Sequence, residues 1–293
     1  MTTAKKTSGI KEKAVLVKLN FRNGVGFTAT DKPVTQEVEE RHNTTKAGRY
    51  VKTLFRRNDI QAIFDAENIA KLAHSRYTLP WLDSGIRILP VAMFEKYNAA
   101  ISKAISDYDV AVARFAERYD EIMEENKTRL KEMFNESDYP SKESAAIGFR
   151  LSVSYFPIPD KDDFRIDASD GIVSGFKIQY EKDMKEYEMN AKSDVADRLS
   201  RSMSKLLNKL GTDDKKITDN ALLKFSELLK DLKGLNVTGD KGIAAAIKEA
   251  EMSFSKETAE ALNSNASYRA QKKEEAQAIV TKLSSSFPRA LEF

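Results

Sequence analysis

Residues 91–134 contain neither proline nor glycine and carry apolar side chains at a regular spacing of seven. This repeat, called the helix seam below, comprises Phe94, Ile101, Tyr108, Phe115 and Ile122. A second series, four residues later, comprises Ile105, Val112 and Tyr119. A sustained seven-residue apolar repeat is typical of a helix that lies along another helix. A continuous helix here is about 65 Å long at about 1.5 Å per residue, so we expect a partner helix to cover it.

A second long helix is predicted from about Gly171 or Phe176 to Leu210, because apolar residues recur there at helical spacing and Gly211 supplies a stop. Its length resembles that of the first helix. We therefore expect the two to pair antiparallel as a coiled-coil-like stalk. An internal pair of this kind leaves it open whether a second copy of the chain also contacts the helix seam.

Two segments alternate between apolar and other residues, as strands do. One runs from Val15 to Phe21, and the other from Ile147 to Tyr155, followed by a predicted returning strand at residues 164–167. The resulting fold class is α+β and predominantly α, with a small antiparallel sheet, two long antiparallel helices and a helical C-terminal region. The expected organisation is a disordered tail (1–13), strands and basic helices (14–90), a long helical hairpin (91–210) that carries a β-hairpin (147–167), and C-terminal helices (211–293).

Composition removes several classes of function. The chain has no cysteine, which excludes disulfides and thiolate chemistry, and no apolar run approaches the roughly 20 residues that span a membrane. We expect a cytoplasmic location. The two histidines, His42 and His74, lack ligand spacing and are predicted to be surface or cap residues. With no nucleotide-binding loop or catalytic motif, we predict no cofactor, no metal and no enzymatic activity.

Positive charge is concentrated near the N-terminus. Residues 1–60 contain 13 Lys and Arg against 6 Asp and Glu, while the remainder contains 35 against 39. If residues 46–57 are helical, one face presents cations to a phosphate backbone. The candidate nucleic-acid contacts are Lys46, Arg49, Lys52, Arg56 and Arg57. The alternative interpretation is a solvated face that acidic residues elsewhere balance.

The segment at residues 79–90, LPWLDSGIRILP, is predicted to be a structured connector in which Trp81 either plugs a helix junction or stacks on a base. With Lys46-Ala47-Gly48-Arg49, Tyr139-Pro140 and Asp163-Phe164-Arg165, this segment resembles landmarks of uncharacterised proteins encoded by tailed bacteriophages. The resemblance implies a bacterial host cytoplasm during infection and a role in DNA metabolism or host interaction. It assigns no functional residue.

The sequence therefore leads to two hypotheses about function. The first is a non-enzymatic phage-type interaction protein that binds a host protein, another partner protein or itself through its long helices. The second is a nucleic-acid-binding accessory protein of phage DNA metabolism or recombination, which contacts phosphates through the basic N-terminal residues.

Overall fold

The computed structural model describes residues 10–23, 26–81, 85–160, 170–211 and 216–287. The chain forms two compact units. The first contains residues 1–18, 75–97 and 155–293, and the second contains residues 19–74 and 98–154. Four elements continue from one unit into the other: β1 (Ala14–Asn23), α2 (Arg57–Tyr77), α3 (Phe94–Glu117) and β6 (Phe149–Phe156). Long helices and a small antiparallel sheet confirm the predicted α+β, predominantly α class.

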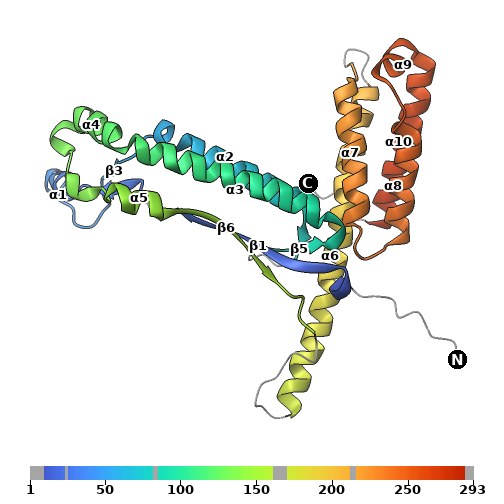
Figure 1. Cartoon of the computed structure of the whole chain (residues 1–293), viewed down its shortest axis with the longest axis horizontal. Helices are drawn as coiled ribbons and strands as arrows, with labels where there is room; N and C mark the ends of the chain where they lie inside the picture. The colour runs from blue at the N-terminus through green and yellow to red at the C-terminus, as the bar shows by residue number, and fades with distance from the viewer. Residues whose placement is uncertain (1–9, 24–25, 82–84, 161–169, 212–215, 288–293) are drawn as a thin grey trace. The chain divides into compact units, whose positions relative to one another are not determined.

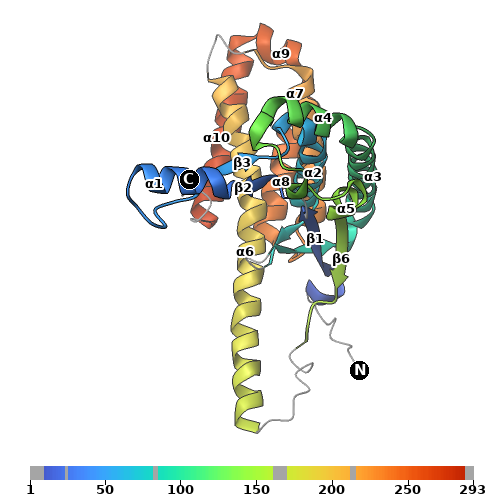
Figure 2. The same ribbon diagram turned by 90° about the vertical axis from the view of Figure 1, so that its left-hand side faces the viewer.

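The first unit is a helical bundle attached to short strands. Its elements are η1 (Ile10–Glu12), β4 (Leu79–Pro80), β5 (Ile86–Pro90), η2 (Val91–Met93), α6 (Asp170–Leu210), α7 (Asp219–Leu235), α8 (Lys241–Phe254), α9 (Ala259–Ser264) and α10 (Ala266–Ser286). In Figures 1 and 2, α7, α8 and α10 run along the upper part of α6. Ala191, Val195 and Leu199 of α6 are buried there.

The long helix α6 ends where its last carbonyls find a side-chain donor. The buried guanidinium of Arg269 donates from Nε to the carbonyl of Leu210 at 3.0 Å, and it also donates to the carbonyl of Lys209. The final carbonyls of a helix have no partner within the helix, so this contact satisfies them as Gly211 ends α6. Near the middle of α6, the buried Trp81 packs on Tyr187 with ring centroids 4.3 Å apart, as a plug between elements would.

The small sheet has the strand order β4-β5-β1-β6. The start of β1 pairs antiparallel with β5, with Ala14 opposite Pro90 and Lys18 opposite Ile86. The predicted strand at residues 15–21 is therefore confirmed. The second predicted strand begins later than expected. Ser141 caps the helix α5 (Lys142–Gly148), so Ile147 is helical and β6 starts at Phe149. The predicted returning strand at 164–167 lies outside the described residues.

The second unit is built around aromatic side chains from several elements. Its remaining elements are β2 (Thr28–Thr30), α1 (Lys32–Arg41), β3 (Val51–Thr53), α4 (Tyr119–Leu130), η3 (Lys131–Met133) and η4 (Glu136–Asp138). The ring centroid of Phe115 lies 5.5 Å from the ring centroids of both Phe55 and Phe149, in edge-to-face geometry. Phe55 makes a similar contact with Tyr139 at 5.6 Å. Edge-to-face packing is favourable beyond the area it buries.

The predicted stalk of two paired long helices gains no support from the structure, because the two helices belong to different units. From residue 98 onward α3 belongs to the second unit, where it lies beside α2 in Figures 1 and 2. The helix α6 belongs to the first unit, and its main partner is α10. The physical reason is that each helix buries its apolar residues within its own unit. The predicted single helix over 91–134 is also interrupted at Arg118, between α3 and α4.

One glycine in the bundle allows a close approach between α7 and η2. A Cβ added at Gly234 would lie 2.3 Å from Sδ of Met93, whose side chain is buried. Helix propensity alone favours alanine by about 1 kcal/mol, but overpacking costs about 1–3 kcal/mol. We expect Gly234→Ala to lower the free energy of unfolding by up to about 2 kcal/mol in urea denaturation.

A matched glycine in α6 provides the control. Nothing lies within 4 Å of a Cβ added at Gly175, so Gly175→Ala is expected to stabilise the chain by up to about 1 kcal/mol. A Gly234→Ala variant as stable as the Gly175→Ala variant would contradict the close packing of Met93 on α7.

Candidate functional site

The basic residues predicted to bind phosphates do not share a helix. Residues 51–53 form β3, which pairs antiparallel with β2 so that Lys52 lies opposite Ala29. The backbone at Lys46 has a φ of 55°, which is incompatible with a right-handed helix. Val51 and Thr53 are β-branched and favour a strand. The condition that residues 46–57 are helical is therefore not met before Arg57, and the cations do not form the ridge that depended on it.

The side chain of Lys52 is buried within the second unit, where two carboxylates balance its positive charge. Its ammonium Nζ lies 2.7 Å from Oδ2 of Asp138 and 3.3 Å from Oδ2 of Asp31, and it donates to the carbonyl of Met133 at 2.6 Å. Burial alone would lower the pKa of Lys52, but hydrogen bonds and charge attraction from Asp138 and Asp31 raise it above its usual value. This lysine joins η3 and η4 to β3 and the start of α1, and its ammonium is held by these protein partners.

The other four cations lie in different surroundings. Arg56 Nη2 lies 2.9 Å from Oδ1 of Asp59 and also pairs with Glu125, and these hydrogen bonds raise the pKa of Arg56. Arg57 begins α2, where it donates to Gln61 at 2.9 Å, while Lys46 and Arg49 lie exposed in the loop before β3. Nucleic-acid contact through these residues stays a prediction, now limited to exposed side chains from two separate segments.

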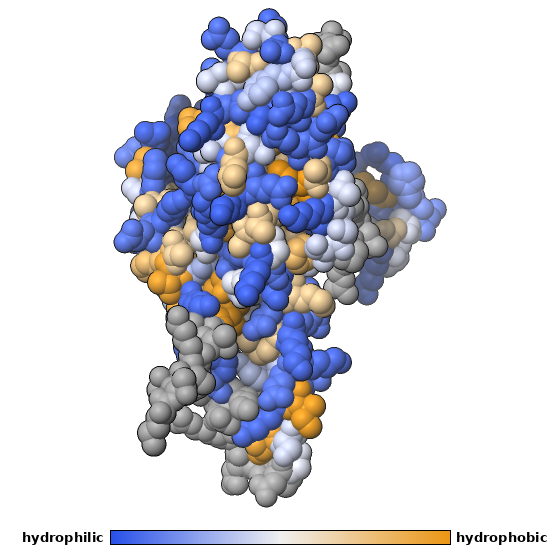
Figure 3. Space-filling view, turned by 90° about the vertical axis from the view of Figure 1, so that its right-hand side faces the viewer, coloured by the Kyte–Doolittle hydropathy of each residue, from blue (hydrophilic) through white to orange (hydrophobic). Residues whose placement is uncertain are grey.

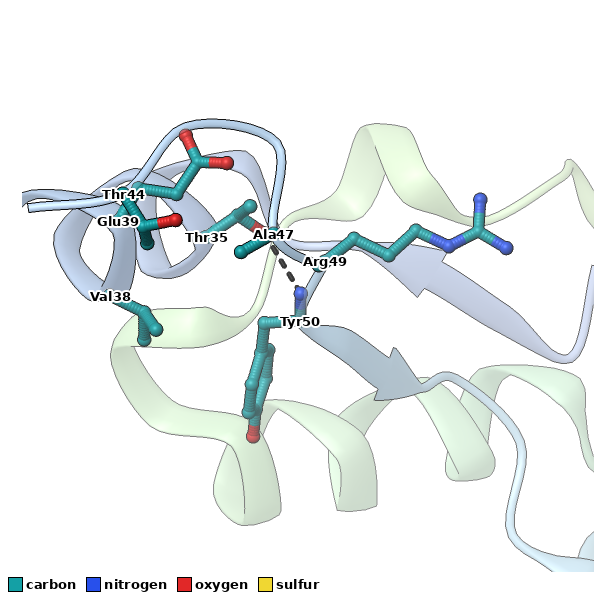
Figure 4. A pocket seen from close by; sticks show the side chains of 8 residues that line it. Thr35, Val38, Glu39, Thr44, Ala47, Arg49 and Tyr50 are labelled. Atoms are coloured by element: carbon teal, nitrogen blue, oxygen red, sulfur yellow. Dashed lines mark hydrogen bonds between the residues drawn. The ribbon is translucent and has the colours of Figure 1, made fainter. Parts of the chain in front are cut away.

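A hollow of about 310 Å³ lies between α1 and this loop, and it includes Arg49 (Figure 4). The hydroxyl of Thr35 accepts a hydrogen bond from the backbone N–H of Tyr50 at 2.9 Å, which fixes the loop against α1. Figure 4 shows the Arg49 guanidinium extending away from Thr35 and Val38. A ligand site needs polar groups that converge on the ligand. The geometry of this hollow therefore favours a braced loop over a binding site.

Most of the helix seam is interior. Ile101, Tyr108, Phe115 and Ile122 are buried in the second unit. Burial raises the pKa of Tyr108 to about 12, and its hydroxyl has no hydrogen-bond partner among the described residues. Phe94 differs from the other four: it lies in the first unit with 42% of its surface exposed, and its ring centroid is 6.2 Å from that of Tyr155. The seam is therefore satisfied largely within the chain.

Of the two histidines predicted to be surface or cap residues, one fits the prediction and the other does not. His42 is exposed at the C-terminal end of α1, as expected of a cap residue. His74 is buried on α2, which corrects the prediction of a surface or cap position. Its position follows that of Ile63, Glu67 and Ala70 along the buried face of α2.

The candidate interaction surface is the first part of α6. Residues 171–190, all described, include no buried side chain, whereas burial begins at Ala191. One face of this segment carries residues spaced alternately by four and three: Gly171, Gly175, Ile178, Lys182, Lys185 and Met189. We call it the α6 face. Ile178 is 70% exposed and Met189 48% exposed. Figure 3 shows hydrophobic side chains on the surface at this lower end of α6.

The opposite side of this α6 segment contacts other residues of the first unit. Tyr187 packs on Trp81, and the hydroxyl of Tyr180 donates to the carbonyl of Pro159. Tyr180 is two residues from Ile178 and therefore about half a turn away around the helix. Sequence reasoning placed the whole of α6 in the stalk and missed the α6 face, although its four-and-three spacing can be read directly from residues 171–189.

Comparisons with protein-family models, curated proteins and solved structures gave no match to this chain. In the part of the chain that the structure describes, no helix is both long and apolar enough to cross a membrane. No three side chains of the types that hold metals gather together among these residues. The arguments for function therefore rest on the residues themselves.

Proposed function

We propose that the chain is a non-enzymatic interaction protein that associates with a second copy of itself through the α6 face. The observation that carries the proposal is that residues 171–190 form a helix without one buried side chain, while α6 packs closely from Ala191 onward. Exposed large apolar side chains on one helical face are typical of a surface that another helix covers. This keeps the function expected from the sequence but moves it from the helix seam to α6.

The shape of the α6 face favours a second copy as the occupant. When two copies are aligned antiparallel with Ile178 opposite Lys182, Gly175 lies opposite Lys185 and Gly171 opposite Met189. Each glycine then faces a long side chain, and nothing lies within 4 Å of a Cβ added at either glycine. The two helices have room to approach closely. The lysine stems cover apolar surface while their ammonium groups reach the edge of the seam.

The proposal predicts a weak, reversible dimer. An interface of one helical face is expected to have a Kd of about 1–100 μM. Size-exclusion chromatography with light scattering over a concentration series should show the mass rising from monomer toward dimer. Met189→Glu should abolish the rise, because it buries a carboxylate against Gly171 of the second copy.

Met252 of α8 offers a matched control. It is 75% exposed and lies outside the α6 face, so Met252→Glu changes charge and size identically and should leave the dimer intact. A wild-type chain that stays monomeric at several hundred micromolar would refute self-association. Equal dissociation by the two methionine variants would refute the assignment to α6.

A further inference from the structure

A groove in the first unit lies between the end of α6 and the beginning of α7. Its volume is about 630 Å³, and its lining includes Lys205, Leu206, Lys209, Ala221, Lys224 and Phe225. We call it the lysine groove. Its volume falls within the roughly 300–1,000 Å³ of small-molecule sites.

Three cations border the lysine groove. Lys205 and Lys209 lie one turn apart on α6, and Lys224 comes from α7. None of the three forms an ion pair with an acidic residue that the structure describes. Other cations on α6 do form such pairs, since Arg198 Nη2 lies 2.6 Å from Asp194 Oδ2. None of the described side chains that line the groove is acidic. Among the residues that the structure describes, the groove therefore concentrates positive charge that no acidic side chain of its lining neutralises.

The interior of the groove is apolar. Leu206 and Phe225 are buried and contribute to its lining, and the small side chain of Ala221 leaves space beside them. A ligand that fits must place an anionic group at the lysines and an apolar body against Leu206 and Phe225. Ammonium groups bind phosphate and similar anions as point charges, and apolar contact supplies the remaining affinity. A nucleic-acid backbone is a poorer match, because it needs cations spaced along an extended track.

We propose that the lysine groove binds an amphiphilic anion, a small molecule with a phosphate, sulfonate or carboxylate on an apolar body. The proposal does not depend on self-association, because the groove and the α6 face lie on different parts of α6.

The probe is 8-anilinonaphthalene-1-sulfonate, an aromatic sulfonate whose fluorescence rises in apolar surroundings. We expect the folded full-length chain to bind it at one saturable site. K205Q/K209Q/K224Q should weaken binding at least about tenfold. Ala221→Leu retains every charge but fills the groove, and it should weaken binding about fivefold or more. Circular dichroism of each variant reports whether the fold is kept.

The control K241Q/K248Q/K256Q removes the same charge from exposed lysines of the same unit and should leave binding unchanged. Competition then identifies the class of anion. Displacement by laurate indicates a carboxylate amphiphile, and displacement by adenosine monophosphate indicates a phosphate ester. The proposal is overturned if Ala221→Leu binds as wild type, if the control triple weakens binding equally, or if inorganic phosphate alone displaces the probe as well as either amphiphile.

Discussion

Replacing Lys52 with methionine is expected to lower the free energy of unfolding by about 3–5 kcal/mol. The lysine is 6% exposed and its ammonium lies between the carboxylates of Asp31 and Asp138. Methionine preserves much of the apolar stem but leaves Asp31 buried without its counter-charge. Breaking a buried pair by removing one partner costs more than the pair itself contributes, because the remaining charge stays desolvated. Urea denaturation followed by far-ultraviolet circular dichroism measures the change.

Lys46→Met provides the control for Lys52→Met. Lys46 is exposed, and its side chain forms no ion pair with the described residues, so the same substitution should change the free energy of unfolding by less than about 0.5 kcal/mol. Equal effects at the two positions would contradict the buried ion pairs.

The stabilisation from Lys52 should also depend on pH. The pKa of Lys52 is raised in the folded chain above its ordinary value of 10.5, so its protonation contributes stability that is fully present below that value. The contribution is lost as pH rises through the folded-state pKa. The difference in free energy of unfolding between wild type and Lys52→Met should therefore be constant from about pH 7 to 9 and smaller at about pH 11. A difference that grows with pH would contradict this linkage.

Lys52 also illustrates what the sequence could not reveal. Local spacing placed it on a helical face with Arg49 and Arg56, because the cations recur at intervals of three and four. The strand that forms instead is decided by pairing with β2, more than twenty residues earlier. Asp138, its closer carboxylate, lies 86 positions later in the chain. Charge patterns indicate which residues are available, but tertiary contacts decide which remain exposed.

The seven-residue apolar repeat predicted which residues are buried better than it predicted which elements cover them. Its spacing identified Ile101, Tyr108 and Ile122, all buried, because a helix presents every seventh residue on nearly the same side. It did not identify what covers them, since a core formed by α2 and aromatic rings satisfies such a face as well as a partner helix does. The α6 face was overlooked for the converse reason. Glycine has no side chain and lysine is counted as charged, so the pattern of apolar residues along α6 did not mark this face as an interface.

Phe115→Ala is expected to lower the free energy of unfolding by about 3–5 kcal/mol, because it removes a buried ring that contacts Phe55, Tyr119 and Phe149. Phe94, another position of the helix seam, is 42% exposed, so Phe94→Ala should cost about 1 kcal/mol or less in the same urea denaturation. If the seam is interior, the unfolding midpoint of the Phe94→Ala variant should also depend on protein concentration in the same way as that of the wild type. If the seam joined two copies, the two substitutions would have similar costs, and each would reduce that concentration dependence.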